Sequence, residues 1–158
     1  MSTYNPYLRG AEWRKWDLHV HTPASFHWND GKCFAQMSPS EKEAALKRMY
    51  DTIKQSDVAV FAIMDYWTFD GYLEFRRYLA DMKLTLTKSL FPGIELRIEA
   101  PVDYRLNIQV VLSDKHSTQE LNDFKNALCI RSINRPISDE ALIRFAKSLD
   151  PSKAAVHG

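Results

Sequence analysis

The chain of 158 residues, with 45% hydrophobic and 26% charged residues, has the composition of one globular domain, which excludes a disordered or low-complexity protein. Its 21 basic and 20 acidic side chains nearly cancel, so net charge gives no argument for nucleic-acid binding. Because Cys33 and Cys129 lie far apart and no apolar run is long enough for a secretion signal or a membrane span, we expect a cytoplasmic protein without disulfides, thiolate zinc sites or membrane insertion.

Residue periodicity and capping signals predict strands that alternate with helices along the chain. The clearest helix follows Ser38, which forms a capping box with Glu41. The clearest strand is the apolar run at 57–65, which is typical of a strand buried on both faces of a parallel sheet. The predicted strands cover residues 17–21, 57–65, 90–98, 105–114 and 153–158, and the predicted helices cover residues 38–56, 70–83, 117–128 and 138–149.

This order of elements predicts parallel βα units and an α/β fold. The strand at 90–98 contains Pro92 and Gly93, which we expect to break it. The chain ends directly after the apolar stretch at 153–158, although a parallel strand is normally followed by a covering helix. We therefore expect residues 1–158 to form the front part of a longer protein.

Three of the five histidines lie in the stretch WDLHVHTPASFH, residues 16–27. Residues two apart on a strand point to the same side and lie within about 7 Å of one another. His19 and His21 can therefore present two imidazoles to one metal ion. His27 follows a turn and can fold back toward the same cavity. The alternative is that these rings only make local hydrogen bonds.

Three further polar residues, Asp65, Glu95 and His157, lie on or at the ends of predicted strands, and the C-terminal ends of parallel strands commonly build sites. A carboxylate within a strand, such as Glu95, is costly to bury unless it meets a cation or strong donors. The alternatives are that Asp65 caps the following turn and that Glu95 faces water. Together with the histidines, these residues predict a metal centre, and imidazole and carboxylate ligands suit zinc, manganese or iron.

The same segments resemble a known family. In the order DLHVHTPASFH, FAIMD, PGIEL and AVHG, they resemble the PHP (polymerase and histidinol phosphatase) superfamily of metal-dependent phosphoesterases, whose first motif is H-x-H-T. The longer stretch EWRKWDLHVHTPAS, with DGY after the second motif, is most similar to the N-terminal PHP domain of TrlF-like proteins. Those proteins carry a large AAA-type ATPase region behind that domain.

The resemblance implies a distorted (βα)7 TIM-like barrel of PHP type, of which residues 1–158 form the N-terminal part. It also implies a cluster of two or three divalent metal ions and attack of a metal-activated hydroxide on phosphorus, with Glu95 bridging metals. With the departures described below, we expect one to three ions. The implied partners are a phosphodiester substrate, with nucleic acid among the candidates, and an AAA-type ATPase region of the same or an associated chain. The residues assigned to catalysis are His19, His21, Asp65 and Glu95, and those assigned to metal binding are His19, His21, His27, Glu95 and His157.

Two positions depart from the family's pattern. The second motif normally ends in Asp-His, whereas this chain has Tyr66 in place of that histidine. The fourth strand offers Asn107 or Gln109 instead of a histidine, and His116 is either a substitute ligand from a loop or a solvated side chain. These departures favour a single metal ion, held by the first-motif histidines and Glu95, over a complete three-metal cluster.

The sequence therefore leads to a metal-dependent phosphoesterase or nuclease module, coupled to an ATPase in the longer protein, as the first hypothesis. The alternative is a degenerate PHP domain without catalytic activity that serves in binding or assembly. A plain α/β domain with coincidental histidines is disfavoured by the order of four motifs, and an oligomer is compatible with the sequence. Four cations near the histidines are candidates for phosphate contacts, although scattered cations on a neutral protein are usually solvated: Arg9, Arg14, Lys15 and Lys32.

Overall fold

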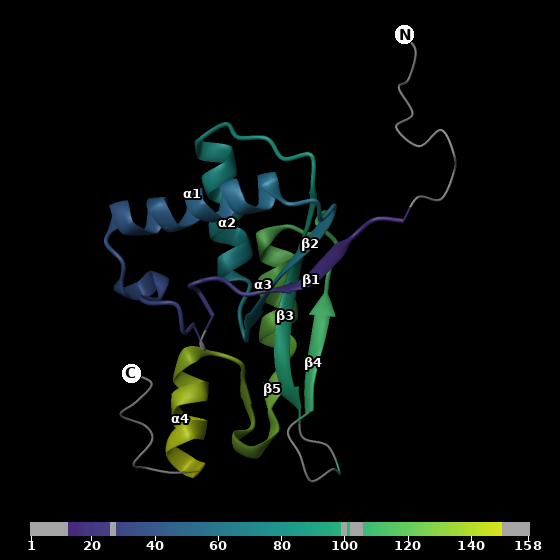
Figure 1. Ribbon diagram of the computed structural model, residues 1–158. Coiled ribbons are helices and arrows are strands. Elements are labelled where there is room, and N and C mark those ends of the chain that lie inside the picture. The colour runs from purple at the N-terminus through teal and green to yellow at the C-terminus, as the bar shows by residue number, and fades with distance from the viewer. Residues whose placement is uncertain (1–12, 26–27, 99–100, 102–105, 150–158) are drawn as a thin grey trace.

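The computed structural model of the chain describes residues 13–25, 28–98, 101 and 106–149. The strands are β1 (Trp16–Val20), β2 (Val60–Tyr66), β3 (Ser89–Ile98), β4 (Leu106–Val111), β5 (Cys129–Ile130) and β6 (Arg135–Pro136). The helices are α1 (Pro39–Gln55), α2 (Asp70–Asp81), α3 (Thr118–Ala127) and α4 (Asp139–Leu149), with short 3-10 helices at Phe34–Gln36 and Arg131–Ile133. The result is a mixed α/β arrangement (Figure 1).

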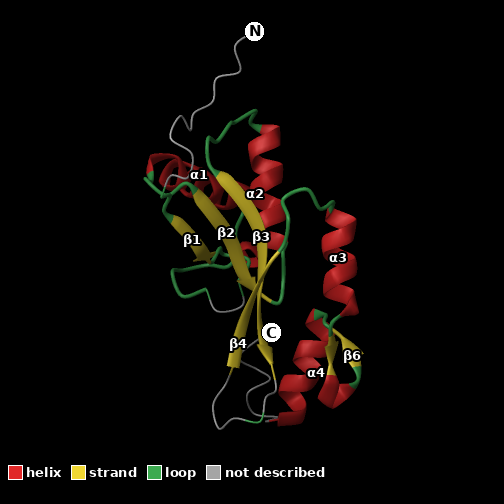
Figure 2. Cartoon of the chain, turned by 90° about the vertical axis from the view of Figure 1, so that its right-hand side faces the viewer, coloured by secondary structure: helices red, strands yellow, loops and turns green. Residues whose placement is uncertain are grey.

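The centre of the fold is a four-stranded sheet in the order β1-β2-β3-β4. β1, β2 and β3 are parallel, which confirms the predicted parallel βα units, and they lie side by side in Figure 2. The predicted helices at 38–56, 70–83, 117–128 and 138–149 are also confirmed, with ends shifted by one or two residues. The predicted strand at 153–158 lies outside the described residues. The short strands β5 and β6 were not predicted, because strands of two residues carry no periodicity.

The fourth strand departs from an all-parallel sheet, since β4 is antiparallel to β3. Residues 99–105 connect the two strands, and a parallel crossover needs a dozen or more residues. The short link therefore forces the chain to fold straight back along β3.

The expectation that Pro92 and Gly93 break a strand is wrong, because β3 runs without interruption from Ser89 to Ile98. The carbonyl of Pro92 accepts a hydrogen bond from the N–H of Leu112, and the N and C=O of one strand residue point to the same neighbour. The donor that proline lacks therefore faces the end of β4, beyond the last paired residue, and no hydrogen bond to β2 is lost. Gly93 lies where a Cβ would come within 2.6 Å of the Met64 side chain.

Strand alternation gives the sheet two different faces. One face carries apolar side chains of β2 and β3, including Ile63 and Ile94, which are buried in the main hydrophobic core with residues of α1, α2 and α3. The opposite face is here called the inner face. It is defined by Met64 and Tyr66 of β2, Glu95 and Arg97 of β3, and Asn107 and Gln109 of β4, which the strand register places on one side.

The sheet is strongly curled around the inner face. Strands three positions apart in a flat sheet would be separated by roughly 14 Å. His19 on β1 nevertheless has its ring nitrogen Nδ1 2.8 Å from the side-chain amide of Gln109 on β4. Figure 1 shows β1 running obliquely across the direction of β3 and β4. The two edge strands are thus brought toward each other as in part of a barrel.

In the part of the chain that the structure describes, no helix has the length and apolar character needed to cross a membrane.

The capping box predicted at the start of α1 is present. The Ser38 hydroxyl accepts the N–H of Glu41 at 3.3 Å, and the Glu41 carboxylate accepts the N–H of Ser38 at 2.8 Å. Replacing Ser38 by alanine removes one acceptor, so Ser38→Ala should lower the free energy of unfolding by about 1 kcal/mol. Arg48→Ala, at an exposed position in the middle of the same helix, should change it by less than about 0.5 kcal/mol. Denaturant titration of both variants checks the difference, and equal losses would contradict it.

Candidate metal site

Three side chains from β1, the residue after it and β3 converge on the inner face: His19, His21 and Glu95. Nε2 of His19 lies 3.1 Å from Nε2 of His21 and 2.7 Å from Oε2 of Glu95. Nε2 of His21 lies 3.5 Å from the same carboxylate oxygen. One atom of each side chain therefore points at a common position.

The donor set fits a divalent transition metal. Ligands bound tetrahedrally to zinc at about 2.0 Å stand about 3.3 Å apart. The three separations between the converging atoms lie on both sides of that value. Imidazole nitrogen and carboxylate oxygen are also ligand types that zinc, manganese and iron accept. The residues present therefore fit such an ion.

A bulge in β1 aims the first of these side chains. Asp17 pairs with Phe61 and Val20 pairs with Ile63, so β1 carries one residue more than β2 over this interval. Such a bulge bends a strand and increases its twist. The N–H of His19, inside the bulge, donates to the Asp17 carboxylate at 3.2 Å. The extra residue therefore keeps a hydrogen-bond partner while the strand turns over the inner face.

Two amide side chains of β4 contact the converging residues. The Asn107 amide donates to Oε1 of Glu95 at 2.7 Å, which leaves Oε2 facing the histidines. The Gln109 amide lies 2.8 Å from Nδ1 of His19. The atom at this distance is the amide nitrogen Nε2 of Gln109. Binding of a metal through Nε2 of His19 requires the proton on Nδ1, and a half-turn of the Gln109 amide brings its oxygen to the position that accepts this proton. The two residues that occupy the fourth strand in place of a histidine thus orient possible ligands.

Tyr66, which follows Asp65 where the family pattern has a histidine, forms a wall of the site. Its ring is stacked on the His21 ring, with centroids 5.0 Å apart and planes inclined by 14°. The guanidinium of Arg97 lies 5.5 Å from the centroid of the same phenol ring. Tyr66 therefore contacts both an imidazole of the site and a cation.

Asp65 lies behind the site and is tied to the chain that leaves β1. Its side chain is 1% exposed, and its two oxygens accept the N–H and the hydroxyl of Thr22, both at 2.7 Å. Burial raises the pKa of the Asp65 carboxyl to about 7, while the hydrogen bonds from Thr22 act in the opposite direction. The separation between its carboxylate and Nδ1 of His21 is 3.9 Å. Its assignment to catalysis stays a prediction, and these contacts give it a structural role.

Ser25 supplies a second contact between β2 and the segment that follows β1. Its hydroxyl accepts the N–H of Tyr66 at 3.3 Å and lies 3.2 Å from Nδ1 of His21. It is buried, so this contact holds the His21 ring from the side opposite Nε2. Thr22 and Ser25 are the residues of the first motif that sequence reasoning passed over, and the polar spacing T-P-A-S directly after the histidines is the signal that could have found them.

An open pocket of about 450 Å³ borders the site beside Tyr66. Aromatic side chains of Phe34 and Trp67 line it, together with the ion pair between Lys42 and Glu74. Trp67 has φ of 64°, a left-handed conformation that costs free energy in a residue other than glycine. Its N–H donates to the Glu95 carbonyl at 3.2 Å, so the strained turn is anchored to the strand that carries the carboxylate.

The structure does not add the remaining predicted site residues to the cluster of His19, His21 and Glu95. His27 and His157 lie outside the described residues. His116 is exposed, and its ring lies 3.8 Å from the Glu120 carboxylate at the start of α3, which agrees with a solvated side chain.

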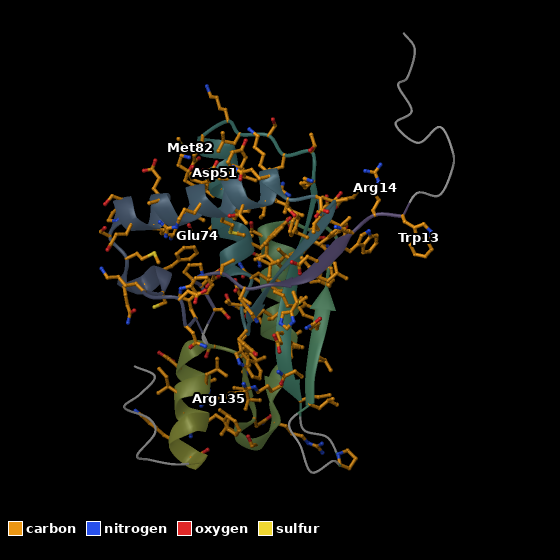
Figure 3. All side chains as sticks on the ribbon, in the orientation of Figure 1. Trp13, Arg14, Asp51, Glu74, Met82 and Arg135 are labelled. Carbon is orange, nitrogen blue, oxygen red and sulfur yellow. The ribbon has the colours of Figure 1, made fainter. Side chains whose placement is uncertain are left out.

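Of the cations predicted near the first motif, Lys15 pairs with Asp57 and Lys32 with Glu41. Arg14 projects beside Trp13 at the N-terminal end of β1 (Figure 3), and Arg9 lies outside the described residues.

No family model and no curated protein matches the chain. A crystal structure from Bifidobacterium adolescentis, provisionally described as a metal-dependent phosphoesterase, matches with a TM-score of 0.37 and 19% sequence identity. The match covers 75% of this chain and 35% of the other, so this chain spans about a third of its length. A similarity at this level carries no argument about function, and membership of the PHP superfamily stays a prediction.

The tie between Asp65 and Thr22 depends on a glycine in the first turn of α2. A Cβ at Gly71 would overlap both the Asp65 carboxylate and the Thr22 side chain. Gly71→Ala should therefore lower the free energy of unfolding by about 1–3 kcal/mol through overpacking, although alanine favours a helix elsewhere. Asp81→Ala at the exposed end of the same helix is the control. Thermal unfolding compares them, and a Gly71→Ala protein as stable as the control would contradict this close packing.

Proposed function

We propose that the chain binds one divalent metal ion through His19, His21 and Glu95 and acts as a metal-dependent phosphoesterase. The observation that carries the proposal is the convergence of two imidazole nitrogens and one carboxylate oxygen within 4.8 Å of one another. Glu95 is 2% exposed. A carboxylate so deeply buried at the side of two imidazoles is costly unless a cation or strong donors meet it.

The chemistry follows from the ligand types. A divalent ion held there supplies, when bound, polarisation of a phosphoryl oxygen and activation of water for attack on phosphorus. Neighbouring side chains hold the three ligands in position. Asn107 holds one oxygen of Glu95 and so fixes the direction of the other, while Gln109 and Ser25 contact the Nδ1 atoms of the two histidines. Outer contacts of this kind set ring orientation in metal sites.

The chemistry of the neighbouring residues supports one ion rather than a cluster. Several divalent ions close together need several carboxylates to offset their mutual repulsion. On the inner face as defined above, Glu95 is the carboxylate, and the positions beside it are occupied by Tyr66, Asn107 and Gln109. We propose zinc, manganese or iron as the ion, because all three accept imidazole and carboxylate ligands.

The motif resemblance supports a wider proposal. We infer that residues 1–158 belong to a PHP-type (βα)7 barrel, that the substrate is a phosphodiester with nucleic acid among the candidates, and that an AAA-type ATPase region works with the domain. The curled sheet with three parallel strands is compatible with part of such a barrel. The alternative of a degenerate, non-catalytic domain draws on Tyr66 standing where the pattern has a histidine, and it predicts binding without hydrolysis.

Metal uptake and hydrolysis by the purified chain test the proposal. Wild-type protein incubated with Mn²⁺ or Zn²⁺ and then desalted should retain about one ion per chain by elemental analysis, and it should hydrolyse bis(p-nitrophenyl) phosphate. His19→Ala and Glu95→Gln should each lose the ion and the activity, because each removes one of three ligands.

His116→Ala is the matched control, since it removes an exposed histidine far along the chain, beside α3, and should retain both properties. Absence of bound metal from the wild type would refute the proposed site. Bound metal without hydrolysis of phosphate monoesters, phosphodiesters or nucleic acid would favour the non-catalytic alternative.

The amide of Gln109 should also contribute to metal affinity. Gln109→Leu keeps all three ligands but removes the group that contacts Nδ1 of His19, and loss of such an outer contact typically costs about 10–100-fold in metal affinity. Competition with a chromophoric chelator measures the dissociation constant. Gln119→Leu on α3, whose amide contacts only Asp123 among the described residues, should leave that constant unchanged. Equal affinities of the two variants would count against an orienting role for Gln109.

A further inference from the structure

Arg97 is placed at the border of the candidate metal site by the strand register. It follows Glu95 by two residues on β3 and therefore lies on the same face. β2 pairs with β3 as far as Tyr66, opposite Glu95, so Arg97 lies just beyond the end of the neighbouring strand. Its guanidinium lies over the Tyr66 ring, at 5.5 Å from the centroid. The Tyr66 ring is in turn stacked on His21.

The charge of Arg97 is not offset by an acidic partner within the described residues, where the ion pairs found involve other cations. Lys15 and Lys32, closer in sequence to the histidines, are paired with carboxylates. Arginine presents a planar fork of donors that matches two oxygens of a phosphate group. Arg97 is thus a cation at the inner face whose donors are suited to an oxyanion.

The spacing along β3 also suits a phosphate group. A phosphate with one oxygen on a metal at about 2.0 Å and another accepting from a guanidinium at about 2.8 Å spans roughly 7 Å. Two residues of a strand advance the chain by about 6.6 Å. A metal ion held by Glu95 and the guanidinium of Arg97 can therefore contact opposite sides of the same phosphate.

We propose that Arg97 is the phosphate-binding side chain of this site, with its guanidinium donating hydrogen bonds to non-bridging oxygens of a phosphate ester that lies over the inner face. The inference rests on the proposed function and extends it from the metal ligands to substrate recognition. Tyr66 positions the guanidinium through a cation–π contact, which gives a reason for an aromatic ring beside His21. The ligand class is a phosphate ester, bound through its anionic oxygens.

Calorimetric titration with inorganic phosphate tests the inference directly. We expect the Mn²⁺-loaded wild-type chain to bind phosphate, and Arg97→Ala to bind it at least tenfold more weakly, because charge-assisted hydrogen bonds are lost. Arg97→Lys keeps the charge without the fork and should recover part of the affinity. For hydrolysis of bis(p-nitrophenyl) phosphate, Arg97→Ala should raise KM by a similar factor. Chelator competition should give the same metal dissociation constant for Arg97→Ala as for wild type.

Arg76→Ala is the matched control. Arg76 on α2 has its guanidinium 5.7 Å from the centroid of the Tyr72 ring and donates to the Tyr72 hydroxyl at 3.0 Å, so its removal takes away an arginine in contact with a tyrosine at a distance from the inner face. It should leave phosphate affinity and KM unchanged.

The outcomes separate the two proposals. If wild type and Arg97→Ala bind metal equally and phosphate equally, the inference about Arg97 is wrong and the metal site stands. If Arg97→Ala loses metal affinity in proportion to phosphate affinity, Arg97 acts by supporting Tyr66 and His21, and the inference is also wrong. If the wild type takes up no metal, the proposed function fails, and phosphate titration of the metal-free chain against Arg97→Ala then decides whether Arg97 binds the anion by itself.

Discussion

The buried carboxylate of Asp65 is the constraint on which the candidate site depends. It lies near the end of β2 and accepts two hydrogen bonds from Thr22, the residue directly after His21. A carboxylate with 1% exposure is costly to leave without donors, so the chain leaving β1 is held at one position against β2. The absence of a side chain at Gly71 gives this contact its room. The ring of His21 is therefore directed by the core of the protein and not by a flexible loop.

The length of the link between β3 and β4 has an equally direct effect on the site. Because residues 99–105 are too few for a helical crossover, β4 returns antiparallel and brings Asn107 and Gln109 to the side of Glu95. A parallel strand after a helix would have its own C-terminal end at the site, and a histidine there would project from a different position. The position of the two amides beside Glu95 thus follows from the antiparallel return of β4. The curl of the sheet then brings Gln109 of β4 into contact with His19 of β1.

Local signals in the sequence predicted the helices, the parallel strands and the H-x-H pair, since each depends on residues close together in the chain. The contact between His19 and Glu95 spans 76 positions, and it depends on the bulge in β1 and on the curl, neither of which has a local signal. The expectation that Pro92 breaks β3 failed for a similar reason: a proline is tolerated where its missing donor faces no partner, and that depends on where β4 ends. No signal in the sequence identified Arg97, because its place at the site depends on its contact with Tyr66 on another strand.

The charges of the inner face connect the metal proposal with substrate recognition. Imidazoles that bind a metal do so as neutral rings, and the amides of Asn107 and Gln109 carry no charge. With one divalent ion held by Glu95 and two histidines, the positive charge of the ion exceeds the negative charge of its ligands, and Arg97 adds a further cation nearby. Such a face attracts anions and disfavours a second divalent ion that brings no carboxylate with it. A phosphate ester supplies the anionic oxygens that this arrangement lacks, which is why the residues that depart from a multi-metal pattern are consistent with one metal ion and an arginine.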